Sequence, residues 1–223
     1  IHAFFVSTRT AYSKSESELT YGTVYNGDFT TTRQYDLKNE SESVMLSLNA
    51  SKRFRGISTT VKAGVDASGS HYQYIRQEQL MPVIRRTVSA TFGVDTRIAS
   101  AVLISYSGSF SDNRVSFDKS TSSCIKILNQ SLTTSFLLGS HVIARTSFRH
   151  YYNDRNEATQ KNSGFINAAI SCRSGRMEYP LSADNLLDTT AYSSTTFSTN
   201  TIYSNIYDLR PLSVLLTVKF SLR

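Results

Sequence analysis

Residues 210–220, Arg-Pro-Leu-Ser-Val-Leu-Leu-Thr-Val-Lys-Phe, carry the clearest structural signal in this sequence. From Leu212 onward every second residue is apolar, and the residues between are mostly polar. The apolar set is Leu212, Val214, Leu216, Val218, Phe220 and Leu222. A period of two indicates a β-strand, because successive side chains point to opposite faces. A final strand with one apolar face is typical of outer-membrane barrels, and a soluble antiparallel sandwich is the alternative.

The same alternation recurs upstream, most clearly over residues 57–68. We expect one face to carry Ile57, Thr59, Val61, Ala63, Val65 and Ala67, and the other to carry Ser58, Thr60, Lys62, Gly64, Asp66 and Ser68. In a membrane barrel the apolar face meets lipid and the polar face lines the lumen. The pattern predicts ten strands, over residues 2–13, 44–51, 57–68, 88–95, 102–110, 124–138, 142–149, 166–172, 177–186 and 212–222.

The connections between these segments alternate in length. Short ones fall at residues 53–56, 96–100, 139–141 and 174–176, and long polar ones at 14–43, 69–86, 111–123, 152–164 and 187–209. Outer-membrane barrels alternate tight periplasmic turns with long extracellular loops, whereas a sandwich spaces its turns more evenly. The sequence therefore predicts an all-β fold, a transmembrane antiparallel up-and-down β-barrel, as a single domain over residues 1–223.

The composition agrees with a barrel and excludes a helical membrane protein. Only 39% of residues are hydrophobic, mean hydropathy is −0.26, and no apolar stretch approaches the roughly 18 residues of a spanning helix. The 13 Tyr and 12 Phe suit strands and a membrane–water interface, although Trp is absent. We therefore expect the outer membrane of a Gram-negative bacterium as the location, with the lipid bilayer and lipopolysaccharide as partners.

The net charge of +7 does not predict nucleic-acid binding, because the basic residues form no stripe with interleaved aromatics. Three of them, Lys62, Arg145 and Arg149, fall on the predicted polar face. They are the candidate ligand-binding residues of the lumen. One interpretation of Arg145 and Arg149 is that they pair with lumen carboxylates, and the other is that they form a positive wall that steers an anionic ligand.

Catalytic and cofactor chemistry finds little support in the sequence. A surface enzyme would need carboxylates and a His side chain at the outer rim of the barrel. The candidates for that rim are Asp112, Asp118, Asp154 and His150. Of the other histidines, His71 also falls toward the outer ends of the strands, and His2 and His141 fall toward the short turns. Such residues are ordinary for a polar rim, so we expect no enzyme. No metal-ligand spacing or phosphate-binding loop occurs, which predicts no cofactor. Cys172 falls on the apolar face, so Cys124 and Cys172 are expected as small apolar residues rather than a disulfide.

The last fifty residues resemble a known family. Ala183–Asp184–Asn185–Leu186–Leu187–Asp188, then a loop with Tyr192 and Tyr203, then Tyr207–Asp208–Leu209–Arg210–Pro211 and the final strand are similar to the C-terminal barrel region of TonB-dependent outer-membrane transporters. The nearest branch carries a carboxypeptidase-regulatory-like domain ahead of its plug. Leu187 stands where that family usually has Phe, and Leu212 where a basic residue is common.

The resemblance implies the wall of a 22-stranded barrel that takes up a scarce ligand, with a plug and a TonB-contacting segment encoded upstream. It also implies contact with the barrel-assembly machinery through the terminal strand, and with a surface lipoprotein. One alternative is a non-transporting barrel that acts as a scaffold in a surface-lipoprotein or envelope-assembly complex; a complete ten-stranded surface enzyme is another. Strands 2–13 and 212–222 would pair in a complete small barrel, and we expect them to stay apart.

Overall fold

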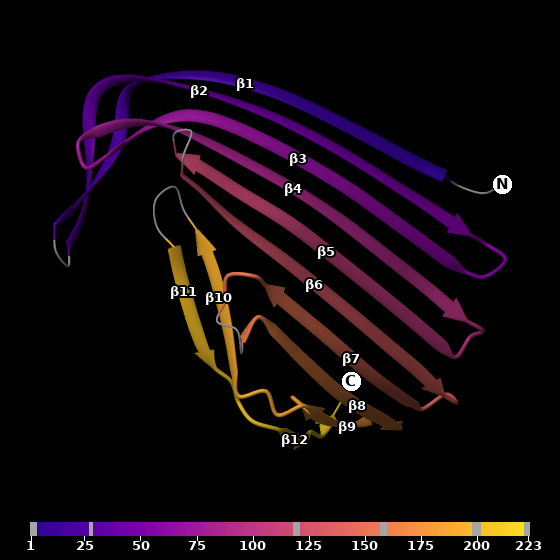
Figure 1. Ribbon diagram of the computed structural model, residues 1–223. Coiled ribbons are helices and arrows are strands. Elements are labelled where there is room, and N and C mark those ends of the chain that lie inside the picture. The colour runs from indigo at the N-terminus through magenta and orange to yellow at the C-terminus, as the bar shows by residue number, and fades with distance from the viewer. Residues whose placement is uncertain (1–3, 27–28, 118–120, 157–159, 198–201, 221–223) are drawn as a thin grey trace.

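The computed structural model describes residues 4–26, 29–117, 121–156, 160–197 and 202–220, which fold into antiparallel β-strands (Figure 1). The strands are β1 Phe4–Asn26, β2 Phe29–Phe54, β3 Thr59–Arg76, β4 Gln79–Ile98, β5 Val102–Phe117, β6 Thr121–Leu138, β7 Val142–Asn153, β8 Asn162–Ser174, β9 Met177–Asp184, β10 Ala191–Phe197, β11 Ile202–Asp208, β12 Ser213–Leu216 and β13 Lys219–Phe220. Among the described residues there is no helix of the length and apolarity needed to cross a membrane.

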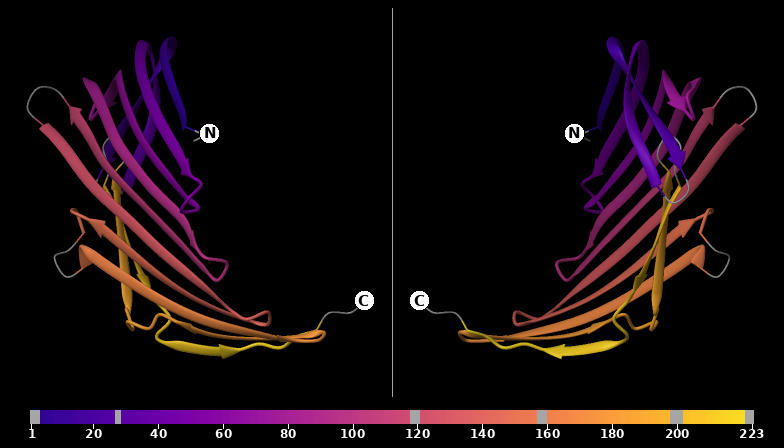
Figure 2. Two further views of the ribbon diagram at one scale, coloured as in Figure 1. Left: turned by 90° about the vertical axis from the view of Figure 1, so that its right-hand side faces the viewer. Right: turned by 90° about the vertical axis from the view of Figure 1, so that its left-hand side faces the viewer.

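One large sheet contains every strand except β10 and β11. Its neighbours follow chain order from β1 to β9, β12 comes next, and β13 also pairs with β9. Strands β10 and β11 form a separate two-stranded hairpin. Figures 1 and 2 show the large sheet as an open, curved wall. The predicted all-β, up-and-down architecture is therefore confirmed, and each predicted segment overlaps a strand, although the structure adds β10 and β11 and divides the last segment into β12 and β13.

The two faces of the wall differ in the predicted way. The strand register places Leu48 beside Val65, Val65 beside Ala90, and Ala90 beside Phe110, all on what we call the outer face. Leu216 is 64% exposed and Val65 49%, so no layer of described residues covers this face at those positions. The expected exposure of the apolar set is confirmed, with only Val61 half-buried among Val61, Ala63, Val65, Val88, Ala90, Phe92, Val214, Leu216 and Val218.

Four short turns join the strands as predicted and define the short-turn end of the sheet, although two of them lie one to three residues later than expected, at 55–58 and 99–101. Gly139 and Gly175 have φ of 71° and 58°, a left-handed conformation that glycine adopts without steric cost. Ser58 and Ala99 take the same conformation in the other two turns. Tight turns of this kind join neighbouring antiparallel strands directly, which explains the strict chain order of the wall.

The long polar segments differ from the prediction. Residues 14–43 were expected to be a loop, but β1 and β2 continue through them as paired strands. The same holds for residues 69–86, where β3 and β4 meet at a turn of Gln77 and Glu78. Residues 14–43 have no continuous apolar face and are held by backbone pairing, so hydrophobic alternation does not reveal them. In residues 69–86 apolar side chains also pack on the inner face, as Val83 does, which breaks the alternation seen in the middle of the wall. Gly27 and Asp28 of the predicted turn lie outside the described residues.

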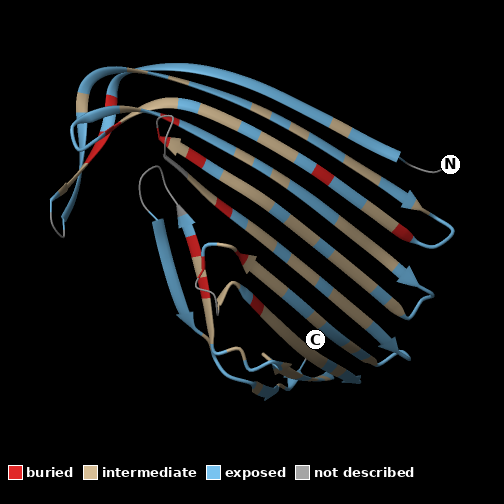
Figure 3. Cartoon of the chain, viewed as in Figure 1, coloured by how far each residue is buried: buried red, intermediate tan, exposed pale blue. Residues whose placement is uncertain are grey.

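At this long-connection end the β1–β2 hairpin bends over and β1 reaches the edge of β3 (Figures 1 and 2). Gly22 lies against Ile75 so closely that a Cβ on Gly22 would be 2.7 Å from the Ile75 Cβ. A small core is buried here, with Val83, Val115 and Phe117 at its centre. Figure 3 shows most buried residues toward this end, while the rest of the wall is mainly intermediate or exposed.

The terminal strand is interrupted, and the sheet is not closed by it. The prediction had one strand over 212–222, whereas the structure has β12 and β13 separated at Thr217 and Val218. Pro180 of β9 lies opposite this break; its carbonyl accepts from the Thr217 N–H, but Pro has no N–H to return. Among the described residues no pairing joins β1 to β12 or β13, in agreement with the expected open sheet.

Candidate functional site in the concave face

A cavity of about 1100 Å³ lies against the inner face of the wall. Most of its wall-side lining comes from positions that alternate with the apolar outer set, among them Asn49, Lys62, Thr91, Ser109, Asn129 and Arg149. The register brings these positions side by side, with Ser109 opposite Thr91 and Asn129 opposite Ser109. Hydroxyl and amide side chains thus cover the centre of the inner face, which suits water or a polar ligand.

The three cations predicted for the lumen lie on this inner face and have different partners. Lys62 forms an ion pair with Asp95, Nζ to Oδ2 3.2 Å, and Ser105 donates to the other carboxylate oxygen at 2.9 Å. Arg145 donates from Nε to the Ser135 hydroxyl at 3.3 Å, nearer the short-turn end. Arg149 is exposed and has no ion pair with any described residue. Among the described residues neither Arg145 nor Arg149 has the carboxylate partner considered for it, whereas Lys62 does have one.

The β10–β11 hairpin adds an aromatic corner to the cavity. Tyr192 of β10 meets Tyr151 edge to face, with ring centroids 4.9 Å apart, and contacts Phe165 at 6.2 Å. Tyr207 of β11 stacks on its other side at 6.0 Å. Burial, with a hydrogen bond to Tyr151, raises the pKa of Tyr192 to about 12, so this phenol stays neutral at physiological pH. Arg149 is adjacent to this corner, because it lies opposite Phe165.

Asn185 holds the base of the hairpin in place. Its side-chain amide donates to the carbonyls of Thr189 and Arg210 at 2.9 Å each, and its Oδ1 accepts from the Thr189 N–H at 3.0 Å. Its φ of 58° is one that Asn tolerates better than most residues. Asp188 accepts from the Leu212 N–H at 3.0 Å. The two motifs that carry the family resemblance, 183–188 and 207–211, therefore meet at one junction.

The upper part of the hairpin is held by the β7–β8 connection. Asn153 donates from Nδ2 to the Thr195 carbonyl, and Asn156 from Nδ2 to the Ser193 carbonyl, both at 2.8 Å. Asn153, Ser193 and Thr195 are almost completely buried. Among the described residues β10 has no strand neighbour on this side, so the side-chain amides of Asn153 and Asn156 supply the hydrogen bonds that a neighbouring strand would give to its carbonyl groups. The hairpin is thus fixed at both its base and its rim.

The residues considered for catalysis are held by different partners. Asp112 accepts two hydrogen bonds from Arg114, the Asp154 carboxylate accepts from the Lys126 N–H, and His150 bonds Asn162 at 3.1 Å. His71 is exposed beside Ile84, and His141 bonds Ser140 at 2.6 Å next to a short turn. His2 and Asp118 lie outside the described residues. The structure does not join His150 to Asp112 or Asp154.

Neither cysteine is in a disulfide, and Cys172 is exposed on the outer face as expected. Cys124 is half-buried and its thiol donates to Asp112 at 3.4 Å, so it has a polar contact that the sequence does not indicate. Within the described ranges no group of three or more His, Cys, Asp or Glu side chains is arranged to hold a metal ion.

The aromatic corner and the Asn185 junction are not singled out by the sequence analysis. Residues 187–209 carry no clear alternation, and the hairpin in them was expected to be a loop. Asn185 could have been found, because it lies inside the 183–188 motif quoted above. The contacts of Tyr151 and Phe165 with Tyr192 join distant segments, so nothing local in the sequence reveals them. Comparison of the chain with protein-family models, with curated proteins and with solved structures found no match.

Proposed function

We propose that this sheet is part of the wall of an outer-membrane β-barrel, and that the barrel is a TonB-dependent transporter that takes up a scarce ligand. The observation that carries the membrane part is the exposed apolar outer face opposite a polar cavity. A water-soluble protein rarely leaves so continuous an apolar surface uncovered. In a barrel the lipid covers it, and the polar inner face lines an aqueous lumen.

The height of the apolar band supports this proposal. On β5 the outer face is apolar or small from Val102 to Phe110 and then changes to Asp112 and Arg114. These nine residues, 102 to 110, match the roughly 9–11 that a tilted strand needs to cross the hydrocarbon. In contrast, 26-residue β2 would be about 86 Å long if straight, so its far half would extend well beyond a bilayer.

The proposal of transport rests on the lining of the inner face and on the sequence resemblance to TonB-dependent transporters. The fixed β10–β11 hairpin narrows the lumen beside Arg149, which has no carboxylate partner among the described residues and can attract an anionic ligand. Tyr151, Phe165 and Tyr192 add apolar faces next to that charge. A passage with a few polar groups and aromatic faces can select a ligand, whereas a scaffold needs no such lining.

The membrane proposal is tested by reconstituting the protein encoded by the intact gene into phosphatidylcholine vesicles and probing it with protease, since an isolated sheet would leave backbone groups unpaired in the hydrocarbon. We expect strands β3 to β9 to be protected between the short turns and the long connections. Cleavage throughout the outer face, as in vesicle-free buffer, would contradict the proposal. Folding of the chain in water with the outer face buried in a soluble dimer would contradict it too.

The transporter and the scaffold are separated by their partners. Site-specific crosslinking in cells that carry the intact gene should join the protein to TonB, which supplies energy to transporters of this kind. A scaffold would crosslink to a surface lipoprotein without any TonB contact. The reading frame gives a second test: a plug-encoding segment upstream of Ile1 is expected for a transporter only.

A further inference from the structure

Basic residues gather on the outer face immediately beyond the apolar band, at the long-connection end. Arg86 of β4 lies directly opposite Arg114 of β5, and Lys126 of β6 lies opposite Asp112. All are on the outer face, because they continue the alternation that places Val88 and Phe110 there. Arg86, Arg114 and Lys126 are exposed. Two guanidinium groups directly opposite on neighbouring strands repel each other, which destabilises a sheet unless an anion lies near them.

Carboxylates within the cluster do not balance these cations. Arg114 binds Asp112 through both Nε and Nη2, at 2.9 and 2.8 Å, which occupies both oxygens of that carboxylate. Asp154 accepts from the Lys126 backbone, and Arg155 brings a fourth cation to the Cys124 carbonyl. Neither Arg86 nor Lys126 has an ion pair with any residue that the structure describes. Within the part of the chain that the structure describes, four cations therefore lie beside two carboxylates.

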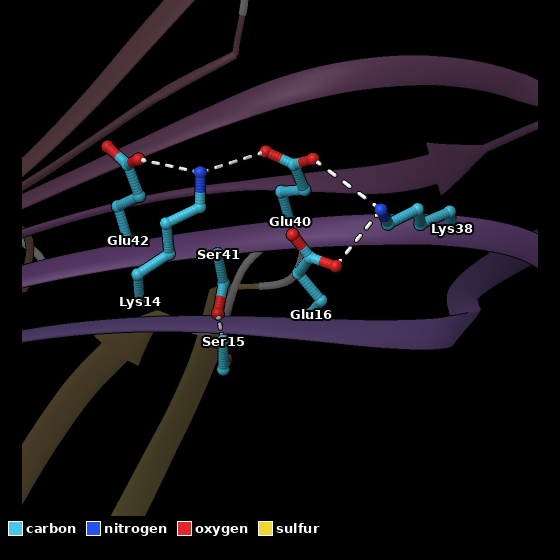
Figure 4. A network of polar contacts seen from close by, with 7 residues as sticks. All are labelled: Lys14, Ser15, Glu16, Lys38, Glu40, Ser41 and Glu42. Carbon is cyan, nitrogen blue, oxygen red and sulfur yellow. Dashed lines mark hydrogen bonds and ion pairs between the residues drawn. The ribbon is translucent and has the colours of Figure 1, made fainter.

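The neighbouring charges of the same face are arranged differently. On the β1–β2 hairpin Lys14 lies between Glu40 and Glu42, and Lys38 pairs with Glu16 and Glu40 (Figure 4). That network neutralises its own lysines and has no need of an external anion. At the long-connection end, the cations of the outer face that lack a carboxylate partner among the described residues thus lie on β4 and β6, beside the Arg114–Asp112 pair of β5.

We propose that Arg86, Arg114 and Lys126 bind the phosphate groups of an anionic lipid whose acyl chains cover the apolar band beneath them. The inference rests on the proposed membrane location and adds a specific lipid partner to it. Continuity with Val88 and Phe110 favours a lipid over a free anion, because the same molecule covers the apolar surface and neutralises the arginines. Arg side chains suit this role, since the guanidinium group binds phosphate through two parallel hydrogen bonds.

The test uses lipid A, a bis-phosphorylated glycolipid, titrated into the chain in a zwitterionic detergent, with bound lipid counted by native mass spectrometry. The variant is Arg86→Gln/Lys126→Gln, which leaves the Arg114–Asp112 pair intact. The matched control, Lys52→Gln/Arg55→Gln, removes two exposed cations at the short-turn end. Each cation near an anionic surface raises the affinity about fivefold, so loss of two cations should weaken lipid A binding by the variant about 25-fold. The control should bind lipid A with nearly the affinity of the wild type.

Three outcomes decide the inference. Equal weakening in both double variants, or none in either, would overturn it, because binding would then follow net charge or apolar contact alone. Displacement of lipid A by an equal concentration of inorganic phosphate would also overturn it, since the site would then be a simple anion site. Insertion of wild type and variant into phosphatidylcholine vesicles is measured in parallel. Insertion without selective lipid A binding contradicts this inference only, whereas failure of every protein to insert contradicts the proposed function as well.

Discussion

The middle of the wall and its long-connection end use the same strands in opposite ways. In the middle of β4 the apolar residues occupy even positions on the outer face, such as Val88 and Phe92, and the inner face is polar. Toward the end of the same strand Val83 is at an odd position, points inward and is fully buried, while Arg86 is on the outer face. At this end apolar residues thus also occupy the inner face, while Ile84 and Leu80 remain exposed on the outer face.

The difference between the two regions of this strand shows that the environment of each face sets where apolar residues occur. In the middle, side chains of the outer face are not covered by protein, and the inner face lines a cavity. At the end, the inner face packs into the small core of Val83, Val115 and Phe117, as in an ordinary soluble protein. If the outer face meets lipid as we propose, the point of change marks the upper limit of the hydrocarbon.

The largest effect is expected for a charge placed in the middle region. Leu216→Arg on the outer face should lower the free energy of unfolding in lipid vesicles by about 2–4 kcal/mol, because the charge would face hydrocarbon. The control is Leu215→Arg on the same strand, whose side chain is 60% exposed on the inner face and should change stability by less than about 0.5 kcal/mol. Equal losses in denaturant titrations of the two variants would contradict the assigned faces.

The Asn185 junction gives the next largest effect, and it is local to the hairpin. Asn185→Ala removes three side-chain hydrogen bonds and places Ala at a φ of 58°, for an expected loss of about 2–3 kcal/mol. Asn185→Gly removes the same bonds without the backbone strain, so it should cost about 1 kcal/mol less. Hydrogen exchange should rise in β10 and β11 and stay unchanged in β4 and β5. A uniform rise across the wall would contradict a local junction.

The sequence predicts the middle region well and the end region poorly, for a physical reason. Where one face is apolar and the other polar, as around Val65 and Lys62, the alternation predicts both that the segment is a strand and which face each side chain occupies. In the β1–β2 extension both faces are polar, and the pattern of residues such as Lys14 and Ser15 cannot be told from a loop. Only the backbone pairing, which sequence does not show, makes these residues a strand.

The candidate site likewise has residues that the sequence predicts and contacts that it does not. Lys62, Arg145 and Arg149 were found because alternation assigns them to the inner face, and the structure places all three there. Their partners were not predictable: Asp95 reaches Lys62 from the neighbouring strand, while Arg149 has no such neighbour among the described residues. The hairpin that completes the cavity depends on contacts between segments about forty residues apart, such as Asn153 with Thr195.

A smaller effect is expected where the end region packs tightly. Gly22→Ala would place a Cβ 2.7 Å from the Ile75 and Tyr35 side chains and 2.9 Å from the Ile75 carbonyl oxygen. This overpacking should cost about 1–2 kcal/mol, measured by denaturant unfolding. Gly56→Ala, in a turn with nothing within 4 Å of the new Cβ, should be nearly neutral. A neutral Gly22→Ala would mean that β1 does not approach β3 in solution.

The smallest effect concerns the charged hairpin of the end region (Figure 4). A hydrogen bond from Lys38, together with its charge, lowers the pKa of Glu16 below its ordinary value of 4.5. Because the folded-state pKa of Glu16 is depressed, the ion pair stabilises the hairpin fully above the unfolded-state pKa. This stabilisation is lost as the pH falls through the folded-state pKa.

We expect pepsin to cleave the β1–β2 hairpin faster as the pH is lowered through that range, and Glu16→Gln to remove most of this pH dependence. Salt should weaken the effect, since both side chains are exposed. The wall strands should show no matching change, and equal acid sensitivity in β5 and β6 would indicate global unfolding in place of a local ion pair.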